Sequence, residues 1–170
     1  MVTFVIHESM IQERVAVQIK IKPYLKAFLL SIYGKNEPLF FPKKDKFNDL
    51  LAHLLSKPPS NFIPKAPSPD GLLVIIPYFE HINIVCYNHL SQNSQVIFEQ
   101  RVQARFWVTF ESYIDESFRL NISISNAISL FVEKYNIPYT SVVEDMLKKA
   151  IYRSRRIQKK YPKRSYTYNK

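Results

Sequence analysis

The chain has 170 residues, 46% of them hydrophobic, and includes 12 Phe and 11 Tyr. This supply of apolar side chains is enough for one packed core and excludes a chain that is disordered throughout. With two Gly and a single Cys, the sequence also argues against glycine-rich phosphate loops and internal disulfides, and we expect a cytoplasmic protein.

The formal charge of +10 is concentrated at the C-terminal end. The last 23 residues contain ten Lys and Arg and no Asp or Glu, whereas the preceding 147 residues hold 14 basic and 14 acidic side chains. A positive segment without counter-charge is typical of proteins that bind a polyanion. We therefore expect a nucleic acid as the partner, with DNA favoured. We expect no membrane, because no apolar run approaches the ~20 residues of a membrane span.

Hydrophobic periodicity predicts the N-terminal elements. Residues 13–22 alternate apolar and polar side chains, as a half-buried strand does, and residues 24–33 and 45–56 follow the helical period. Gly34 is well placed to end the first helix. Five prolines within residues 58–70 then predict an extended connector.

The second part of the chain is predicted to be mainly helical. Residues 71–79 and 82–89 are rich in Ile, Val, Tyr and Phe and predict a central β-hairpin. An i, i+4 ladder of apolar side chains predicts a long helix over residues 94–118, and two amphipathic patterns predict helices over 124–135 and 141–156. The expected fold class is α+β.

These elements divide the chain into four expected parts. They are a strand–helix–helix segment over residues 1–57, the connector over 58–70, a β-hairpin plus helical domain over 71–156, and a basic tail over 157–170. The tail is expected to be flexible because it contains Pro162 and lacks an apolar stripe.

The pattern from Ile124 to Arg156 resembles a helix-turn-helix motif, in which one helix supports another that enters the major groove. Its turn carries Asn136 and Pro138, where such motifs often have glycine. The resemblance implies that basic side chains of the second helix contact phosphates or base edges. The candidate nucleic-acid-binding residues of this helix and the tail are Lys148, Lys149, Arg153, Arg155, Arg156, Lys159, Lys160, Lys163 and Arg164.

The basic segment is expected to have two roles. The helical part up to Arg156 holds side chains in fixed positions and could carry sequence specificity, whereas the tail would act as an electrostatic anchor. Tyr161, Tyr166 and Tyr168 alternate with the basic residues of the tail. Because aromatic rings stack on unpaired bases, single-stranded DNA or RNA remains an alternative partner.

A second resemblance involves the predicted strand and first helix, residues 13–33. They resemble the opening of a ribbon-helix-helix repressor, whose strands from two subunits pair and lie in the major groove. Arg14, Gln18 and Lys20 would then face the bases. The loop between the two predicted helices is longer than the turn of that family, and a plain sheet strand is the alternative.

Three residue groups raise the question of catalysis or metal binding. Asp70 and Glu80 resemble the paired carboxylates of metal-dependent nucleases, but Ile82 stands where that motif has lysine. His81, Cys86 and His89 would lie too far apart, or on opposite faces, along one strand, which predicts a buried cysteine and surface histidines. Glu111, Asp115 and Glu116 are expected on a solvated helix face. We expect no enzymatic activity, no cofactor and no metal.

The sequence therefore predicts a non-enzymatic DNA-binding protein, such as a small transcription regulator or accessory protein of the phage or mobile-element type. A homodimer is compatible with this role, because short reading elements usually need two half-sites. Two alternatives remain open. One is a structural or assembly protein, for instance of a virion, whose tail lies against packaged nucleic acid, and the other is an RNA-binding protein.

Overall fold

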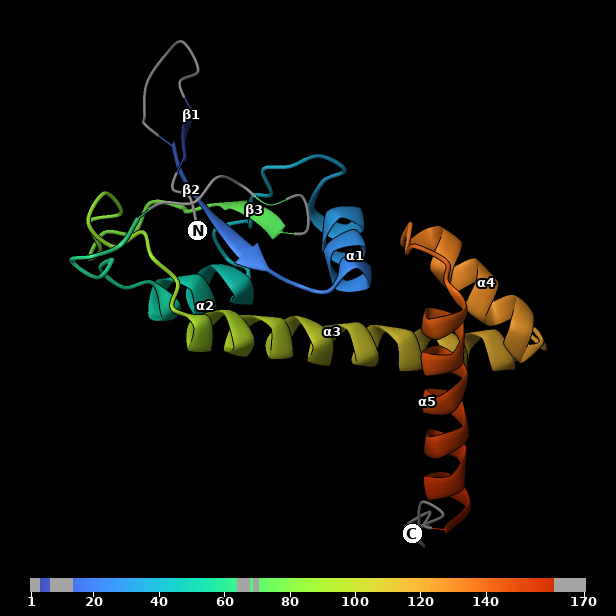
Figure 1. The fold of residues 1–170 in the computed structure, drawn as a ribbon. Coiled ribbons are helices and arrows are strands. Elements are labelled where there is room, and N and C mark those ends of the chain that lie inside the picture. Colours follow the sequence, from blue (N-terminus) through green and yellow to red (C-terminus); the bar gives the residue numbers. More distant parts are fainter. Residues whose placement is uncertain (1–3, 7–13, 64–67, 69–70, 161–170) are drawn as a thin grey trace, which may run out of the picture.

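The computed structural model describes residues 4–6, 14–63, 68 and 71–160. It has an α+β fold, as expected (Figure 1). The elements in chain order are β1 (Phe4–Ile6), β2 (Arg14–Lys20), α1 (Pro23–Tyr33), α2 (Lys46–Leu54), β3 (Gly71–Ile75), α3 (Gln92–Arg119), α4 (Ile124–Lys134) and α5 (Ser141–Lys160). No helix in these ranges has the length and apolar character needed to cross a membrane.

The three strands form one antiparallel sheet in the order β1-β2-β3. The central strand β2 pairs with β3 in a register that places Val17 opposite Val74. Its alternating side chains Val15, Val17 and Ile19 are buried, as the period-two pattern predicts. Because β2 precedes the proline-rich connector and β3 follows it, the sheet joins the two parts of the chain.

The predicted central β-hairpin is wrong, because β3 ends at Ile75 and residues 82–89 form turns instead of a strand. One edge of β3 pairs with β2. The other edge is occupied by Leu39, whose N–H donates to the Leu73 carbonyl and whose carbonyl accepts from the Ile75 N–H, both at 2.8 Å. Asn83 also favours a local turn, since its side-chain oxygen accepts from the Val85 N–H at 3.0 Å.

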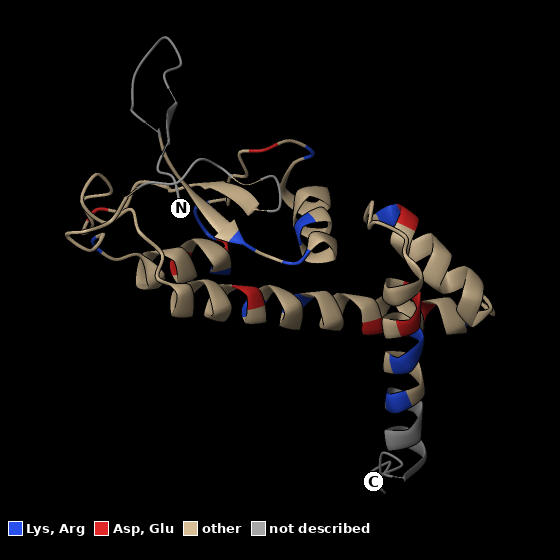
Figure 2. Ribbon diagram, in the orientation of Figure 1, with Lys and Arg blue, Asp and Glu red and all other residues tan. Residues whose placement is uncertain are grey.

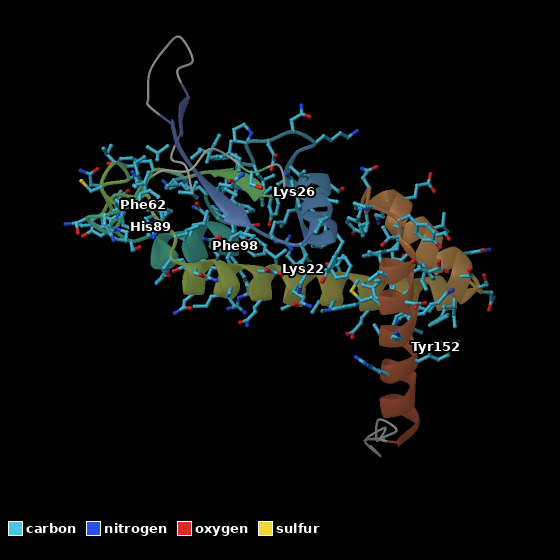
Figure 3. The ribbon with its side chains drawn as sticks, viewed as in Figure 1. Lys22, Lys26, Phe62, His89, Phe98 and Tyr152 are labelled. Atoms are coloured by element: carbon cyan, nitrogen blue, oxygen red, sulfur yellow. The ribbon has the colours of Figure 1, made fainter. Side chains whose placement is uncertain are left out.

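The long helix α3 supports the rest of the fold. Its i, i+4 ladder is buried along its length and comprises Phe98, Val102, Phe106, Phe110 and Ile114. Figure 3 shows Phe98 between α3 and α2, where its ring centroid lies 5.5 Å from that of Phe47. At the middle of the helix, Phe106 contacts Phe28 of α1 and Phe131 of α4 edge-on. One hydrophobic core thus includes residues from before and after the connector.

Two asparagines end helices α3 and α4 in the same way. Asn121 follows α3 and Asn136 follows α4, and both have left-handed backbone, with φ of 57° and 48°. In the second turn the Asn136 N–H donates to the Glu133 carbonyl at 3.1 Å, and the Ile137 N–H donates to the Val132 carbonyl at 3.0 Å. This is the Schellman arrangement, and Asn136 takes the position that glycine usually occupies in it.

We expect Asn136→Ala to lower the free energy of unfolding by about 1 kcal/mol, because alanine tolerates a left-handed backbone poorly. Asn136→Gly should stay within about 0.5 kcal/mol of the wild type, because the strain that glycine relieves is offset by its larger entropy in the unfolded chain. Urea unfolding followed by circular dichroism compares the three proteins. Equal losses for alanine and glycine would contradict the importance of the left-handed turn.

Candidate nucleic-acid interface

The basic helix α5 packs on the body with its first half and then projects away from it (Figure 1). Leu147 and Ile151 are buried in the core, and Val143, Met146 and Ala150 pack against it. Further along the helix, the positions that continue this stripe are Ser154, Ile157 and Gln158. The stripe therefore becomes mainly polar along the projecting part of α5, which continues to Lys160, beyond the predicted end at Arg156 (Figure 1).

The basic positions of α5 share one side of the helix. Counted at about 100° per residue, they fall within an arc of about 160° that is centred away from Leu147 and Ile151. Figure 2 shows acidic residues where α5 crosses α3 and basic residues farther along α5. The seven positions are Lys148, Lys149, Arg153, Arg155, Arg156, Lys159 and Lys160.

The structure describes the side chains of some candidate residues but not of others. The side chains of Lys149 and Arg153 are exposed. Arg155, Arg156, Lys159 and Lys160 have backbone in α5, but their side chains lie outside the described part of the structure. Lys163 and Arg164, together with the tyrosines of the tail, also lie outside the described residues.

Among the basic residues of α5 whose side chains are described, Lys148 forms an ion pair, through its ammonium, with Glu144 at 2.5 Å. The hydrogen bond from Lys148, together with one from Tyr139, holds the pKa of Glu144 below its usual value. The same bond to Glu144 raises the pKa of Lys148. Part of the charge of Lys148 is therefore compensated within the helix, and Lys149 and Arg153 are the better candidates for contact with a polyanion.

Sequence reasoning missed Tyr152, whose side chain is 67% exposed on the projecting part of α5 (Figure 3). It lies four residues from both Lys148 and Arg156, so the helical period places it within the basic side of α5. That spacing was the available signal. An aromatic ring in this position can contact a thymine methyl group or a base face.

The distribution of charge along α5 differs from the helix-turn-helix resemblance. The N-terminal residues of a helix-turn-helix reading helix contact the bases. Here the first turns of α5 carry Glu144 and Asp145, and the positive charge begins at Lys148. The geometry is closer to that of a basic helix whose distal half projects from a folded support.

The ribbon-helix-helix resemblance is wrong, because β2 has β1 on one side and β3 on the other and so has no open edge for a second subunit. Gln18, one of its predicted base-reading residues, instead exchanges hydrogen bonds with the backbone of Ser68. The alternative expectation, a plain sheet strand, is confirmed.

The described residues contain no group of three or more His, Cys, Asp or Glu side chains that could hold a metal ion. Cys86 is exposed, contrary to the prediction of a buried cysteine, because the segment around it forms turns. His89 packs edge-on against Phe62 at 4.8 Å between ring centroids (Figure 3), and burial lowers its pKa. Asp70, the first carboxylate of the nuclease-like pair, lies outside the described residues.

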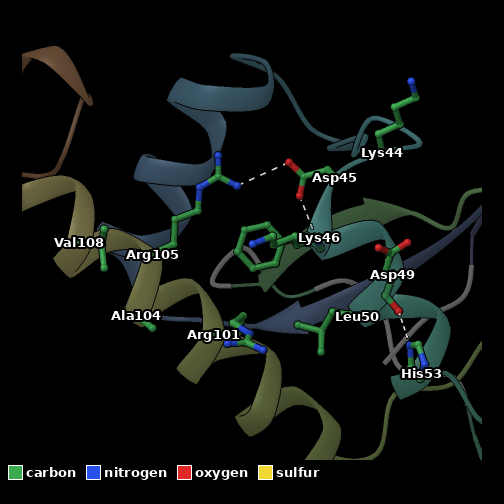
Figure 4. Close-up of a pocket in the computed structure, with 11 residues that line it drawn as sticks. Lys44, Asp45, Lys46, Asp49, Leu50, His53, Arg101, Ala104, Arg105 and Val108 are labelled. Carbon is green, nitrogen blue, oxygen red and sulfur yellow. Dashed lines mark hydrogen bonds and ion pairs between the residues drawn. The ribbon is translucent and has the colours of Figure 1, made fainter.

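A groove of about 930 Å³ lies between α2 and α3 (Figure 4). At its edge, Tyr33 donates a hydrogen bond to Asp45 at 2.6 Å, and Arg105 bonds to both residues. Burial would raise the pKa of Asp45, but hydrogen bonds from Tyr33 and the Phe47 N–H, with the nearby Arg105, outweigh it and hold the pKa below its usual value. Burial and the bond to Asp45 raise the pKa of Tyr33. Neither group titrates near neutral pH, and the network joins α1, the start of α2 and α3.

Protein-family models, curated proteins and solved structures give no match to this chain.

Proposed function

We propose that this chain is a non-enzymatic nucleic-acid-binding protein that contacts DNA through α5 and the basic residues that follow it. In this role it would act in the cytoplasm as a small transcription regulator or accessory protein, with a homodimer as the working form. The observation that carries the proposal is the basic side of α5, which continues after the helix has left the core.

Burial and charge together support this proposal. The basic positions after Ile151 fall on the side of α5 that is turned away from Leu147 and Ile151, the residues that pack in the core. The chain also has no acidic residue after Asp145, so a phosphate backbone approaching the projecting helix meets no repulsion from this segment. A helix of this kind fits the major groove of B-DNA, where basic side chains reach phosphates on either side.

The first test compares the full chain with a chain that ends at Tyr152. This truncation keeps Leu147 and Ile151 in the core but removes eight of the ten basic residues of the C-terminal segment. We expect the shortened chain to retain its thermal unfolding midpoint and to lose most of its affinity for duplex DNA. Binding is measured by fluorescence anisotropy over a series of salt concentrations, because each phosphate contact adds about 0.9 to the slope of log affinity against log salt.

A matched control separates charge from length. In a full-length chain, the same eight basic residues are replaced by glutamine, and we expect it to bind as weakly as the truncation. If the truncated chain binds duplex DNA as tightly as the full chain, the proposal fails. Tighter binding of single-stranded DNA or RNA than of duplex would favour the RNA-binding alternative, since stacking tyrosines remain in the full-length protein.

A further inference from the structure

The α3 side of the groove between α2 and α3 belongs to a longer stripe of exposed residues along α3. Ile97, Ala104 and Val108 are apolar and lie in solvent; Ile97 is 47% exposed and Val108 68%. With Arg101, Glu111 and Asp115, which are also exposed, they follow one another at spacings of four, three, four, three and four residues. Such spacing places all six on one side of a helix, as in the seam of a coiled coil.

The stripe carries charges of opposite sign on either side of its apolar centre. Arg101 lies toward the N-terminal end of α3, and Glu111 and Asp115 lie toward its C-terminal end. We propose that α3 pairs antiparallel with α3 of a second copy of this chain, around a two-fold axis that passes between Ala104 and Val108. The pairing does not require the proposed DNA binding.

The two-fold axis fixes which residues meet. With its centre between Ala104 and Val108, Ala104 of one copy faces Val108 of the other, so a small side chain accommodates a larger one. Arg101 faces Glu111 of the second copy, and by symmetry the same ion pair forms twice. A parallel pairing would place Arg101 against Arg101 and Glu111 against Glu111, and is therefore disfavoured.

The groove provides a wall for the second helix. Arg101, Ala104 and Val108 line it from α3, and Lys46, Leu50 and His53 line it from α2 (Figure 4). A second α3 lying along the stripe would cover Leu50 and bring its acidic end toward Arg101. None of the groove-lining residues belongs to α4 or α5.

The length of the stripe favours a helix over a small molecule as the occupant. From Ile97 to Asp115 it extends about 27 Å along α3, well beyond the ends of the groove. A small ligand in the groove would leave Ile97 and the acidic end uncovered, whereas an antiparallel helix extends over all six positions and places Ile97 of one copy opposite Asp115 of the other. Charge complementarity between the two ends of the stripe identifies that helix as α3 itself.

The test is a charge exchange followed by sedimentation equilibrium of the full-length chain without nucleic acid, over the micromolar to sub-millimolar range. We expect the wild type to reach twice the 20.1 kDa mass of one chain. Arg101→Glu and Glu111→Arg should each raise the dimer dissociation constant at least about tenfold, because each change creates two repulsive contacts. The double variant R101E/E111R should restore dimerisation to within about threefold of the wild type, because the pair is rebuilt with its signs exchanged.

Two control variants make the same charge changes at positions outside the stripe. Lys35→Glu and Glu133→Arg alter exposed residues of the loop after α1 and of α4, and both should dimerise like the wild type. Val108→Glu, which places a charge at the centre of the pair, should abolish the dimer while circular dichroism reports a folded chain. A wild type that stays monomeric, single variants that dimerise normally, or a double variant that is not restored would each overturn the proposal.

Discussion

Replacing Arg153, Arg155 and Arg156 together with glutamine is expected to weaken duplex DNA binding by about 100-fold or more near 0.1 M salt. The three positions lie on the projecting part of α5, on its basic side, so their loss is expected to remove phosphate or base contacts. The slope of log affinity against log salt should fall by about 2.7, or about 0.9 for each contact. Fluorescence anisotropy with a labelled duplex measures both quantities.

The control for this variant removes the same amount of charge elsewhere. Lys35, Lys43 and Lys57 are exposed and precede the sheet strand β3, and the variant K35Q/K43Q/K57Q should bind DNA within about threefold of the wild type. If both triple variants lose affinity equally, binding depends on net charge and α5 has no special role. If neither does, the tail alone carries the affinity.

Phe106→Ala is expected to lower the free energy of unfolding by about 3–5 kcal/mol. Phe106 has no exposed surface, and its ring lies 5.2 Å from those of both Tyr24 and Phe28 and 5.7 Å from that of Phe131. Removing the ring leaves a cavity where α1, α3 and α4 meet, and the edge-on ring contacts are lost as well. The midpoint of urea unfolding should fall accordingly, with an unchanged slope.

A surface substitution provides the comparison for Phe106. Val142 is an apolar residue at the start of α5 and is 76% exposed, so Val142→Ala should change the unfolding free energy by no more than about 0.5 kcal/mol. A loss at Phe106 below about 1 kcal/mol would mean that the core is not organised around this ring.

Helices were the most predictable part of the fold. The predicted helix over 94–118 corresponds to α3, Gln92–Arg119, because a ladder of apolar side chains this long admits only one period. Ser123 caps α4, and its hydroxyl accepts from the Asn126 N–H at 3.4 Å. Local chemistry therefore determines both where these helices lie and where they begin.

Strand pairing was less predictable because it depends on distant residues. The composition of residues 82–89 suits a strand, but the edge of β3 that such a strand would need is taken by Leu39. No local pattern around Leu39 indicates that contact. The burial of Gly71 against Gln18 of β2 is likewise a long-range result, since a Cβ at this glycine would meet the Gln18 side chain at 2.5 Å.

The candidate site divides in the same way. The basic segment can be recognised from the sequence alone, because the positions of Lys and Arg in the chain do not depend on the fold. The helical period also predicts the backbone of α5 as far as Arg156. The point at which α5 leaves the body depends on how its first half packs against α4 and could not be predicted. The exposed stripe of α3 was hidden for a related reason, because the sequence alone does not show which flank of the helix α2 leaves open.

The short length of the projecting helix limits how much sequence one copy could read. From Arg153 to Lys160 it extends about 12 Å, which spans about four base pairs of B-DNA. A site of four base pairs recurs by chance many times in any genome, and all of these copies compete for the protein. One α5 helix in a DNA-binding role would therefore supply affinity but would not select a single target site. In a pair of chains, the target would instead be selected by the distance between the two α5 helices, which sets the spacing of two short half-sites.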